Sequence, residues 1–401
     1  MSYRPLKKYR IIDLTNVLSG PFCGHLLAHM GAEVIKVETP GSGDLARQLG
    51  ADPELNRKKM GVSFLAQNAG KKSLTINLKS RPGKELFRRL IRSADVLIEN
   101  FRPGVMDRLD LGFDDLKLDN PSLVYCAISG FGATGPLRNQ PAYDQIIQGM
   151  SGVMSITGDP QTAPYRVGYP IADTIGGMSA AFAISSILAG RNGDPGDAVF
   201  IDVSMLASTM STMGWVVSNY LMADKVPQPM GNDNFTASPS GTFRTGDGLL
   251  NIAANKQEQF ESLCHILELP HLINDPRFAE RQVRLENRQA LKELLECALA
   301  RKSAGDWEKE LSAGGVPAGC VLSVPEALNH PHLRSRGMIG EFDDVPGVGR
   351  VEIFRPGFKM NGLSPQVEQP PPSLGQHSDE VLQDLGLSPQ EIEQLREQGA
   401  I

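Results

Sequence analysis

The first third of the chain alternates continuous apolar runs with helix-like stretches. Residues 9–14 and 32–37 are apolar runs fit for buried strands, and the helical pattern at 22–30 between them ends at Gly31. This order predicts a βαβ unit, whose two strands pair in parallel through a right-handed crossover. The pattern continues with strands at 73–78, 95–99 and 123–128 and a helix at 83–93. Such repeated alternation predicts an α/β fold with a Rossmann-like, doubly wound sheet.

The pattern changes after residue 200. A Met-rich helical stretch at 204–223 leads into a polar loop at 225–241. A Gly-Asp-Gly turn at 246–248 then predicts a hairpin into a strand at 249–253. Three helix-like patterns follow within residues 256–313. Short strands followed by a group of helices indicate a mixed α+β region.

We therefore expect three parts. A large α/β domain covers residues 1–225, and a smaller α+β domain covers residues 226–330. Residues 331–401 are Pro-rich at first and end in a Glu- and Leu-rich helix at 388–398. Because proline favours extended backbone, we expect this part to be an extended arm and a helix that return to the large domain. A chain of 401 residues also exceeds what one hydrophobic core usually supports.

Composition and charge narrow the class of protein. Hydrophobic residues make up 41% and charged residues 21% of the chain, as in soluble globular proteins. The net charge of -6 argues against nucleic-acid binding, which needs a dominant basic surface. Five dispersed cysteines without a CxxC pair indicate reduced thiols.

Targeting and membrane segments are not expected either. The N-terminus lacks the apolar core of a signal peptide. The most apolar stretches, at 171–190 and 203–223, are interrupted by polar residues and are interpreted as buried helices. We therefore expect a cytoplasmic protein with no nucleic-acid or membrane partner.

Two features near the N-terminus bear on ligand binding. The turn Ser19-Gly20-Pro21 precedes a helix, and helix N-termini bind anions through unpaired N–H groups. The segment lacks GxGxxG, so a nicotinamide dinucleotide site is disfavoured. His25 and His29 have the spacing of zinc ligands on a helix, but no nearby acid or Cys completes the ligand set and HExxH is absent. We predict no metal site.

Asp173 is the candidate catalytic residue. It lies between an apolar approach and a helical stretch rich in Gly, Ser and Ala, where an unpaired carboxylate is costly to bury. Two interpretations stay open at this point. Asp173 can cap a helix that begins at Thr174. Alternatively, it is an ionised carboxylate, held on rigid backbone at a helix start, for nucleophilic catalysis.

Many ordered blocks along the chain resemble a single family. They are Asp13-Leu14 to Pro21, the GAEVIKVE segment at 31–38, Gly43-Asp44, Asn77-Leu78-Lys79, the DVLIENFRPG segment at 95–104, SGFG at 129–132, Gly135-Pro136, Ala142-Tyr143-Asp144, the segment around Asp173, and PPSLGQH at 371–377. Through these blocks the whole chain is similar to the class III coenzyme A transferases, the formyl-CoA transferase or CaiB/BaiF type.

The resemblance implies an interlocked homodimer and a transfer mechanism centred on Asp173. In such enzymes this aspartate attacks an acyl-CoA thioester to form an anhydride, and the released thiolate then gives an aspartyl-CoA thioester. Coenzyme A is a co-substrate, and no permanently bound cofactor or metal is implied. By position, the resemblance assigns CoA binding to Leu18, Ser19, Leu78, Lys79, Asn100, Phe101 and Arg108, and places Tyr143 and Asp144 close to the acyl group.

Departures from the family pattern bear on the substrate. Leu18 stands where the formyl-CoA and oxalate enzymes have a glutamine, and the loop at 231–241 lacks their tetraglycine motif. The chain looks closer to members that move CoA from succinyl-CoA to a dicarboxylate. Arg47 and Arg166 are candidate partners for the distal carboxylate of the acceptor.

Two other functions remain as alternatives. The same fold hosts α-methylacyl-CoA racemases, which need an acid/base pair. Tyr143 stands where those enzymes have a histidine, which argues against the racemase. A non-catalytic CoA-binding protein would not need Asp173, so its presence favours an enzyme.

Overall fold

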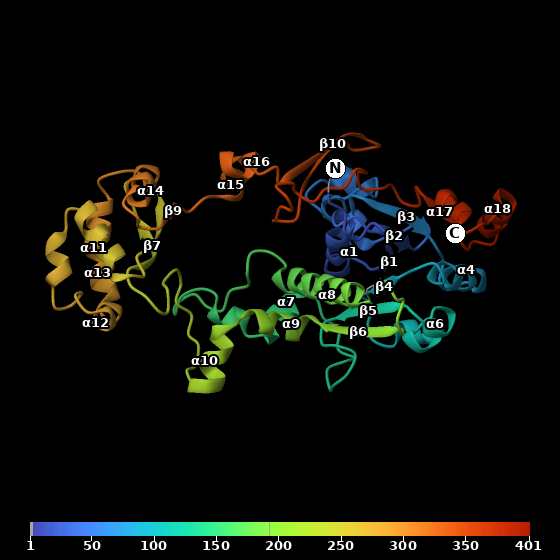
Figure 1. Cartoon of the computed structure of the whole chain (residues 1–401), viewed down its shortest axis with the longest axis horizontal. Helices are drawn as coiled ribbons and strands as arrows, with labels where there is room; N and C mark the ends of the chain where they lie inside the picture. Colours follow the sequence, from blue (N-terminus) through green and yellow to red (C-terminus); the bar gives the residue numbers. More distant parts are fainter. Residues whose placement is uncertain (1–2, 192) are drawn as a thin grey trace. The chain divides into compact units, whose positions relative to one another are not determined.

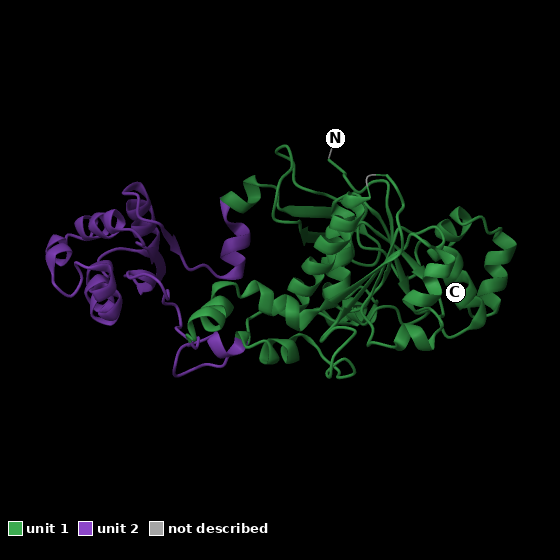
Figure 2. Ribbon diagram, turned by 60° about the horizontal axis from the view of Figure 1, so that its bottom comes forward, with its two compact units in different colours: residues 1–153, 166–225, 332–401 green, residues 154–165, 226–331 purple. Residues whose placement is uncertain are grey.

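The computed structural model describes residues 3–191 and 193–401, and this part of the chain divides into two compact units (Figure 2). Unit 1 runs to Val153 and adds Arg166–Lys225 and His332–Ile401, while unit 2 consists of Met154–Tyr165 and Val226–Pro331. The expectation that residues 154–165 belong to the large domain is wrong. The Gly231 N–H bonds to the Gly158 carbonyl at 2.7 Å, which ties this segment to unit 2.

Unit 1 is built on a parallel sheet, to which the described residues contribute six strands in the order β3-β2-β1-β4-β5-β6 (Figure 1). The strands are β1 (Arg10–Leu14), β2 (Glu33–Glu38), β3 (Lys71–Thr75), β4 (Val96–Glu99), β5 (Val124–Ser129) and β6 (Val199–Ser204). All neighbouring pairs are parallel, which confirms the predicted α/β class. The order reverses between β1 and β4, and sheets of this kind bind ligands at such a switch point, outside the carboxyl ends of the strands.

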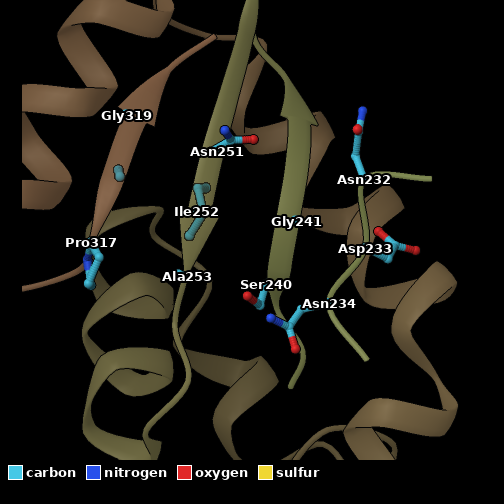
Figure 3. A pocket seen from close by; sticks show the side chains of 11 residues that line it. Asn232, Asp233, Asn234, Ser240, Gly241, Asn251, Ile252, Ala253, Pro317 and Gly319 are labelled. Atoms are coloured by element: carbon cyan, nitrogen blue, oxygen red, sulfur yellow. The ribbon is translucent and has the colours of Figure 1, made fainter. Parts of the chain in front are cut away.

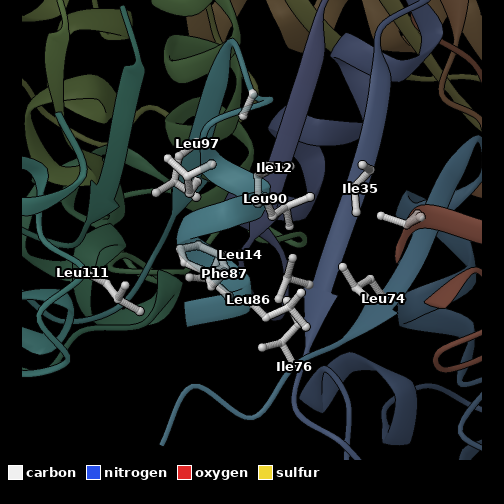
Figure 4. Close-up of a cluster of buried hydrophobic side chains, with 14 of the residues drawn as sticks. Ile12, Leu14, Ile35, Leu74, Ile76, Leu86, Phe87, Leu90, Leu97 and Leu111 are labelled. Atoms are coloured by element: carbon white, nitrogen blue, oxygen red, sulfur yellow. The ribbon is translucent and has the colours of Figure 1, made fainter. Parts of the chain in front are cut away.

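Helices cover both faces of this sheet. Successive strand residues point to opposite faces, so Ile12 of β1 joins one hydrophobic core and Ile11 joins the other. The first core packs against α4 (Arg81–Ile91), whose Phe87 and Leu90 are fully buried (Figure 4). Burying each of these side chains contributes roughly 1.5–3 kcal/mol to stability.

The second core lies between the sheet and two helices, α1 (Ser19–His29) and α8 (Ile171–Gly190). By length and composition alone, α8 is apolar enough to cross a membrane. However, its Ala180 and Ile184 are fully buried against the sheet core. In unit 1, α8 therefore acts as a core helix.

The remaining elements of unit 1 surround this framework. They are η1 (Leu45–Gln48), α2 (Pro53–Arg57), α3 (Val62–Asn68), α5 (Val105–Arg108), α6 (Phe113–Asp119), α7 (Asp144–Met150), η2 (Val153–Ile156, which reaches into unit 2), α9 (Met205–Thr212), α10 (Trp215–Ala223), α16 (Pro331–Ser335), β10 (Ile339–Val345), β11 (Gly349–Phe354), α17 (Ser378–Asp384) and α18 (Pro389–Glu397).

Two sequence predictions for these elements need correction. The single helix predicted over 204–223 is wrong, because Gly214, with a φ of 50°, separates α9 from α10. The arm predicted after residue 331 is not extended throughout, because β10 and β11 form an antiparallel hairpin. Val345 and Val351 of this hairpin pack against Leu65 of α3. The last part of the chain does return to unit 1, where α17 and α18 join the first core.

In unit 2, the described residues form a three-stranded antiparallel sheet in the order β7-β8-β9, with helices packed on it. The elements are β7 (Ser240–Arg244), β8 (Leu249–Ala253), α11 (Gln257–Ile266), η3 (Pro270–Asn274), α12 (Arg281–Glu286), α13 (Arg288–Leu299), α14 (Ala304–Ala313), β9 (Ala318–Cys320) and α15 (Val324–Asn329). The predicted turn at 246–248 joins β7 to β8. Trp307 is buried in the core, and its ring N–H donates to the Leu299 carbonyl at 2.8 Å.

Candidate active site

The residues that the resemblance singled out lie on segments that follow the carboxyl ends of the strands of unit 1. Leu18 and Ser19 follow β1, Leu78 and Lys79 follow β3, Asn100 and Phe101 follow β4 with Arg108 at the end of α5, Tyr143 and Asp144 begin α7 after β5, and Asp173 is in the first turn of α8. Because the carboxyl ends of parallel strands meet at one edge, the topology gathers these segments around the switch point.

Asp173 is the third residue of α8, so the interpretation of Asp173 as the helix cap is wrong. The helix begins directly after Pro170, whose carbonyl accepts the Thr174 N–H at 3.1 Å. Asp144, at the start of the neighbouring helix α7, caps α8 instead. Its Oδ1 accepts the N–H of Ala172 at 2.9 Å and that of Asp173 at 3.4 Å. A carboxylate at this position also compensates the positive end of the helix dipole.

A buried glutamine locks Asp144 and the segment before α8 in place. Gln148 is fully buried in α7. Its Nε2 donates to Asp144 Oδ2 at 2.7 Å and to the Tyr169 carbonyl at 3.2 Å, while its Oε1 accepts the Val167 N–H at 2.9 Å. Gln148 was not among the residues that the sequence patterns pointed to. Gln148 follows Asp144 by four residues, or one helical turn, and this spacing is the sequence signal that indicates an interaction between Asp144 and Gln148.

Burial, and secondarily the neighbouring Asp144 carboxylate, raise the pKa of Asp173 from 3.8 to about 7. The expectation that its place at a helix start keeps Asp173 firmly ionised is therefore wrong, because desolvation outweighs the helix dipole. At neutral pH a large fraction of Asp173 is still a carboxylate. Because that carboxylate is poorly solvated, it is a better nucleophile than an exposed one.

Close packing brings the start of α1 to the turn of α8 that follows Asp173. A Cβ atom on Gly177 would lie 2.4 Å from the Ser19 carbonyl and 3.3 Å from the Cys23 nitrogen, so only glycine fits between the two helices. Gly177 is four residues after Asp173, so the two share a helix face. In the described part of the chain no side chain caps α1, and its first N–H groups therefore remain to bind a ligand.

The loops after β3 and β4 combine apolar anchors with exposed cations. Leu78 and Phe101 pack on the first core, whereas Lys79 and Arg108 are exposed. A cavity of about 440 Å³ borders the loop after β4 and is lined by Phe101 and by the buried Glu99, whose pKa burial raises to about 8. Exposed cations on anchored loops suit the binding of phosphate groups.

Comparison with known proteins identifies the family. The profile of CoA-transferase family III matches residues 6–378. The chain belongs to CoA-transferase family III. This confirms the resemblance seen in the sequence, and the chain is an enzyme that transfers coenzyme A.

Relatives across this family have similar lengths and folds. Succinyl-CoA:glutarate CoA-transferase of Mus musculus is 34% identical over 96% of this chain and 87% of its own length. Acetyl-CoA:oxalate CoA-transferase of Acetobacter aceti is 40% identical over 84% of this chain and 85% of its own. The crystal structure of a CaiB/BaiF family protein from Brucella suis has a TM-score of 0.83 and 34% identity, and covers 95% of this chain and 99% of that one.

One residue that the sequence suggested for this CoA-transferase cannot contact a substrate. Arg47 was a candidate partner for the acceptor carboxylate, and this is wrong, because its side chain is fully buried. Its Nε and Nη2 bond to the Glu38 carboxylate at 2.6 and 2.8 Å. Arg166, the other candidate, is exposed and lies 4.0 Å from Asp144.

The histidine pair of this CoA-transferase is part of the core. His25 and His29 are buried in α1, and burial lowers the pKa of His29 to about 4. Within residues 3–191 and 193–401, no group of three or more His, Cys, Asp or Glu side chains is arranged to hold a metal ion.

Unit 2 of the CoA-transferase has a cavity of its own, of about 420 Å³, whose lining is partly polar and partly apolar (Figure 3). Its lining includes Asn232, Asp233, Asn234 and Asn251. The amide oxygen of Asn251 accepts a hydrogen bond from the Thr242 hydroxyl at 2.6 Å.

Proposed function

We propose that this enzyme moves CoA from succinyl-CoA to a dicarboxylate through covalent intermediates on Asp173. The observation that carries the proposal is the partly desolvated Asp173 carboxylate, one helical turn before the point where Gly177 packs against the start of α1. The names of the Mus musculus and Acetobacter aceti relatives, which act on glutarate and oxalate, support a dicarboxylate acceptor.

The first half of the reaction loads the enzyme with CoA. A carboxylate oxygen of Asp173 attacks the thioester carbonyl of succinyl-CoA, and the C–S bond breaks to release the CoA thiolate and leave a succinyl-aspartyl anhydride. The thiolate then attacks the Asp173 acyl carbon. The anhydride bond breaks, succinate leaves, and Asp173 carries CoA as a thioester.

The second half repeats these steps in reverse order with the acceptor. The acceptor carboxylate attacks the Asp173 acyl carbon and expels the CoA thiolate, which gives a new anhydride. The thiolate attacks the acyl carbon of the acceptor, and the new acyl-CoA leaves as the Asp173 carboxylate is restored. Each step passes through an oxyanion, for which the N–H groups at Leu18 and Ser19 are suited partners.

The binding roles follow the same division of the site. Lys79 and Arg108 pair with CoA phosphates, and Leu78, Asn100 and Phe101 shape the loops that receive the nucleotide. Tyr143 and Asp144 border the acyl group. The charge of Asp144 also helps to raise the pKa of Asp173, and its hydrogen bonds to the N–H groups of Ala172 and Asp173 hold the first turn of α8.

Trapping of the intermediates tests this mechanism. The enzyme is mixed briefly with succinyl-CoA, treated with hydroxylamine or borohydride, and measured as an intact protein by mass spectrometry. We expect a modification on the wild type that maps to Asp173 and is absent from Asp173→Asn. A wild-type enzyme that transfers CoA without any modification at Asp173 would exclude the covalent route.

An α-methylacyl-CoA racemase is the second candidate, because a carboxyl group with a pKa of about 7 also suits proton transfer. The racemase would exchange deuterium from solvent into a 2-methylacyl-CoA. We expect no such exchange, since no histidine occupies the position of Tyr143. Exchange without CoA transfer would reverse this assignment.

We also propose that the enzyme is a cytoplasmic, interlocked homodimer. Phe182 of α8 is 76% exposed, and Leu221 and Met222 of α10 are 73% and 81% exposed. Large exposed apolar side chains of this kind mark protein interfaces. Two differently tagged preparations, mixed after folding, should form no hybrid dimers, whereas refolding them together should produce hybrids. A monomer in light scattering would contradict the proposal.

A further inference from the structure

The turn between β1 and α1 has an unusual backbone conformation. Val17 has a φ of 68°, in the left-handed region where a β-branched residue is a genuine outlier. Such conformations persist only when the surrounding structure over-determines them, and they gather at functional sites. Val17 directly precedes Leu18 and Ser19, the residues at the start of α1.

One of the groups that hold this turn is the side-chain amide of Asn100. Its Oδ1 accepts the Asn16 N–H at 2.8 Å, and its Nδ2 donates to the Asn16 carbonyl at 2.8 Å. Asn100 follows β4 and Asn16 follows β1. The pair of hydrogen bonds therefore joins the two loops on either side of the switch point.

A buried carboxylate holds the next residue of the turn. Asp44 Oδ1 accepts the Val17 N–H at 2.9 Å, and Asp44 Oδ2 lies 2.9 Å from the Lys36 ammonium group. Lys36 is fully buried and also donates to the Thr15 carbonyl at 2.7 Å. Thr15 in turn donates its N–H to Asp13 at 3.1 Å. The N–H groups of residues 15 to 17 are thus all bonded to side chains.

We propose that Asn100 and Asp44 are positioning residues that keep Val17 in the left-handed conformation. They thereby hold the first N–H groups of α1 beside Asp173 before acyl-CoA arrives. This inference rests on the proposed function. The role of Asn100 then differs from the CoA contact that the resemblance assigned. Both the oxygen and the nitrogen of its amide are bonded to Asn16, so Asn100 affects CoA binding only through the turn.

The first test compares Asn100→Ala with a matched control. Asn120 is a buried asparagine that, like the half-buried Asn100, fixes backbone, through bonds from Nδ2 to the carbonyls of Ile91 at 2.9 Å and Ala94 at 2.6 Å. However, it lies before β5, at the opposite edge of the sheet. Loss of two hydrogen bonds in Asn100→Ala should raise the Kd for CoA, measured by calorimetry, about tenfold. Asn120→Ala should lower the melting temperature and leave the Kd unchanged.

A rescue experiment separates positioning from direct contact. Glycine adopts a positive φ without strain, so Val17→Gly reduces the need for the clamp. The double variant Asn100→Ala/Val17→Gly should recover most of the lost CoA affinity. If Asn100 contacted CoA directly, Val17→Gly would restore nothing, and the proposal would be overturned.

Two further outcomes keep the test decisive. If Asn100→Ala does not fold, Asn100→Asp keeps the acceptor for the Asn16 N–H but places a carboxylate against the Asn16 carbonyl, and the same rise in Kd is expected. An unchanged Kd in a folded variant at Asn100 refutes the positioning role. These experiments measure the Kd for CoA. Their outcome does not depend on whether the wild type forms an adduct at Asp173, and adduct formation is the separate test of the proposed function.

Discussion

Replacing Asp144 by asparagine tests how this site sets the reactivity of Asp173. Asp144 accepts the Asp173 N–H at 3.4 Å, and asparagine keeps an acceptor oxygen while it removes the negative charge. The pKa of Asp173 is raised from 3.8 to about 7, mainly by burial and further by Asp144. Removing that charge should therefore lower the pKa of Asp173 without exposing it to water.

The size of the change follows from the order of the two causes. Burial is the larger, so Asp144 accounts for less than half of the rise, or at most about 2 kcal/mol. We expect the pKa of Asp173 in Asp144→Asn to fall to roughly 6. At pH 6 roughly one tenth of Asp173 is ionised in the wild type, and about one half would be ionised in the variant.

The assay is the pH dependence of adduct formation in a single turnover. Asp173 must be ionised to attack, so the rate rises with pH through the pKa. The ratio of the rates at pH 6 and pH 8 cancels any general loss of activity, and it should increase about fivefold in Asp144→Asn. Gln148→Leu is the control, because it frees the same loop while it keeps the charge, and its ratio should match the wild type. An unchanged ratio in Asp144→Asn would refute the assigned coupling.

Three other changes give distinct outcomes. The pKa of Asp173 is 3.8 in the unfolded chain and about 7 in the folded one, so its ionisation destabilises the fold increasingly as the pH rises between these values. In thermal melts, Asp173→Asn should therefore be more stable than wild type at pH 8, by up to about 4 kcal/mol, but not at pH 4. Gly177→Ala should lower the free energy of unfolding in urea by roughly 1–3 kcal/mol and slow adduct formation, because its Cβ would meet the Ser19 carbonyl. Gly190 has open space around it, so Gly190→Ala should change neither quantity. Arg108→Ala should raise the KM for succinyl-CoA about tenfold at low salt and less at high salt, and the exposed Arg81→Ala should have no effect on initial rates.

Local patterns in the sequence predicted five of the six strands that the described residues contribute to the sheet, but not β6 at its edge. Apolar runs separated by helical stretches indicate parallel strands because each run is buried on both faces, as Ile11 and Ile12 of β1 are. The motif blocks drew attention to Asp173. Its helix position could not be predicted, since the residue that caps α8 is Asp144, which is 29 positions away.

Long-range pairing explains the other errors. The guanidinium group of Arg47 is of the kind that binds carboxylate ligands, but it is already hydrogen-bonded to Glu38 and to the carbonyl of Pro372. Lys71 and Asp13, fully buried and 2.8 Å apart, likewise give no local signal, because they are on different strands. Only the folded chain brings such partners together, and a buried charge without its partner would be strongly unfavourable.

The return of α17 and α18 to the first core has a consequence for biosynthesis. Val381 and Leu382 belong to that core, and the Asn77 N–H bonds to the carbonyl of Ala400 at 2.8 Å. During translation, the core that begins with β1 must therefore wait for residues made more than 300 positions later. Unit 2, which is largely one continuous segment, can fold in the meantime. Nascent chains of this enzyme thus expose part of the first core until α17 and α18 are made, and their yield in the cell should depend on chaperones that shield it.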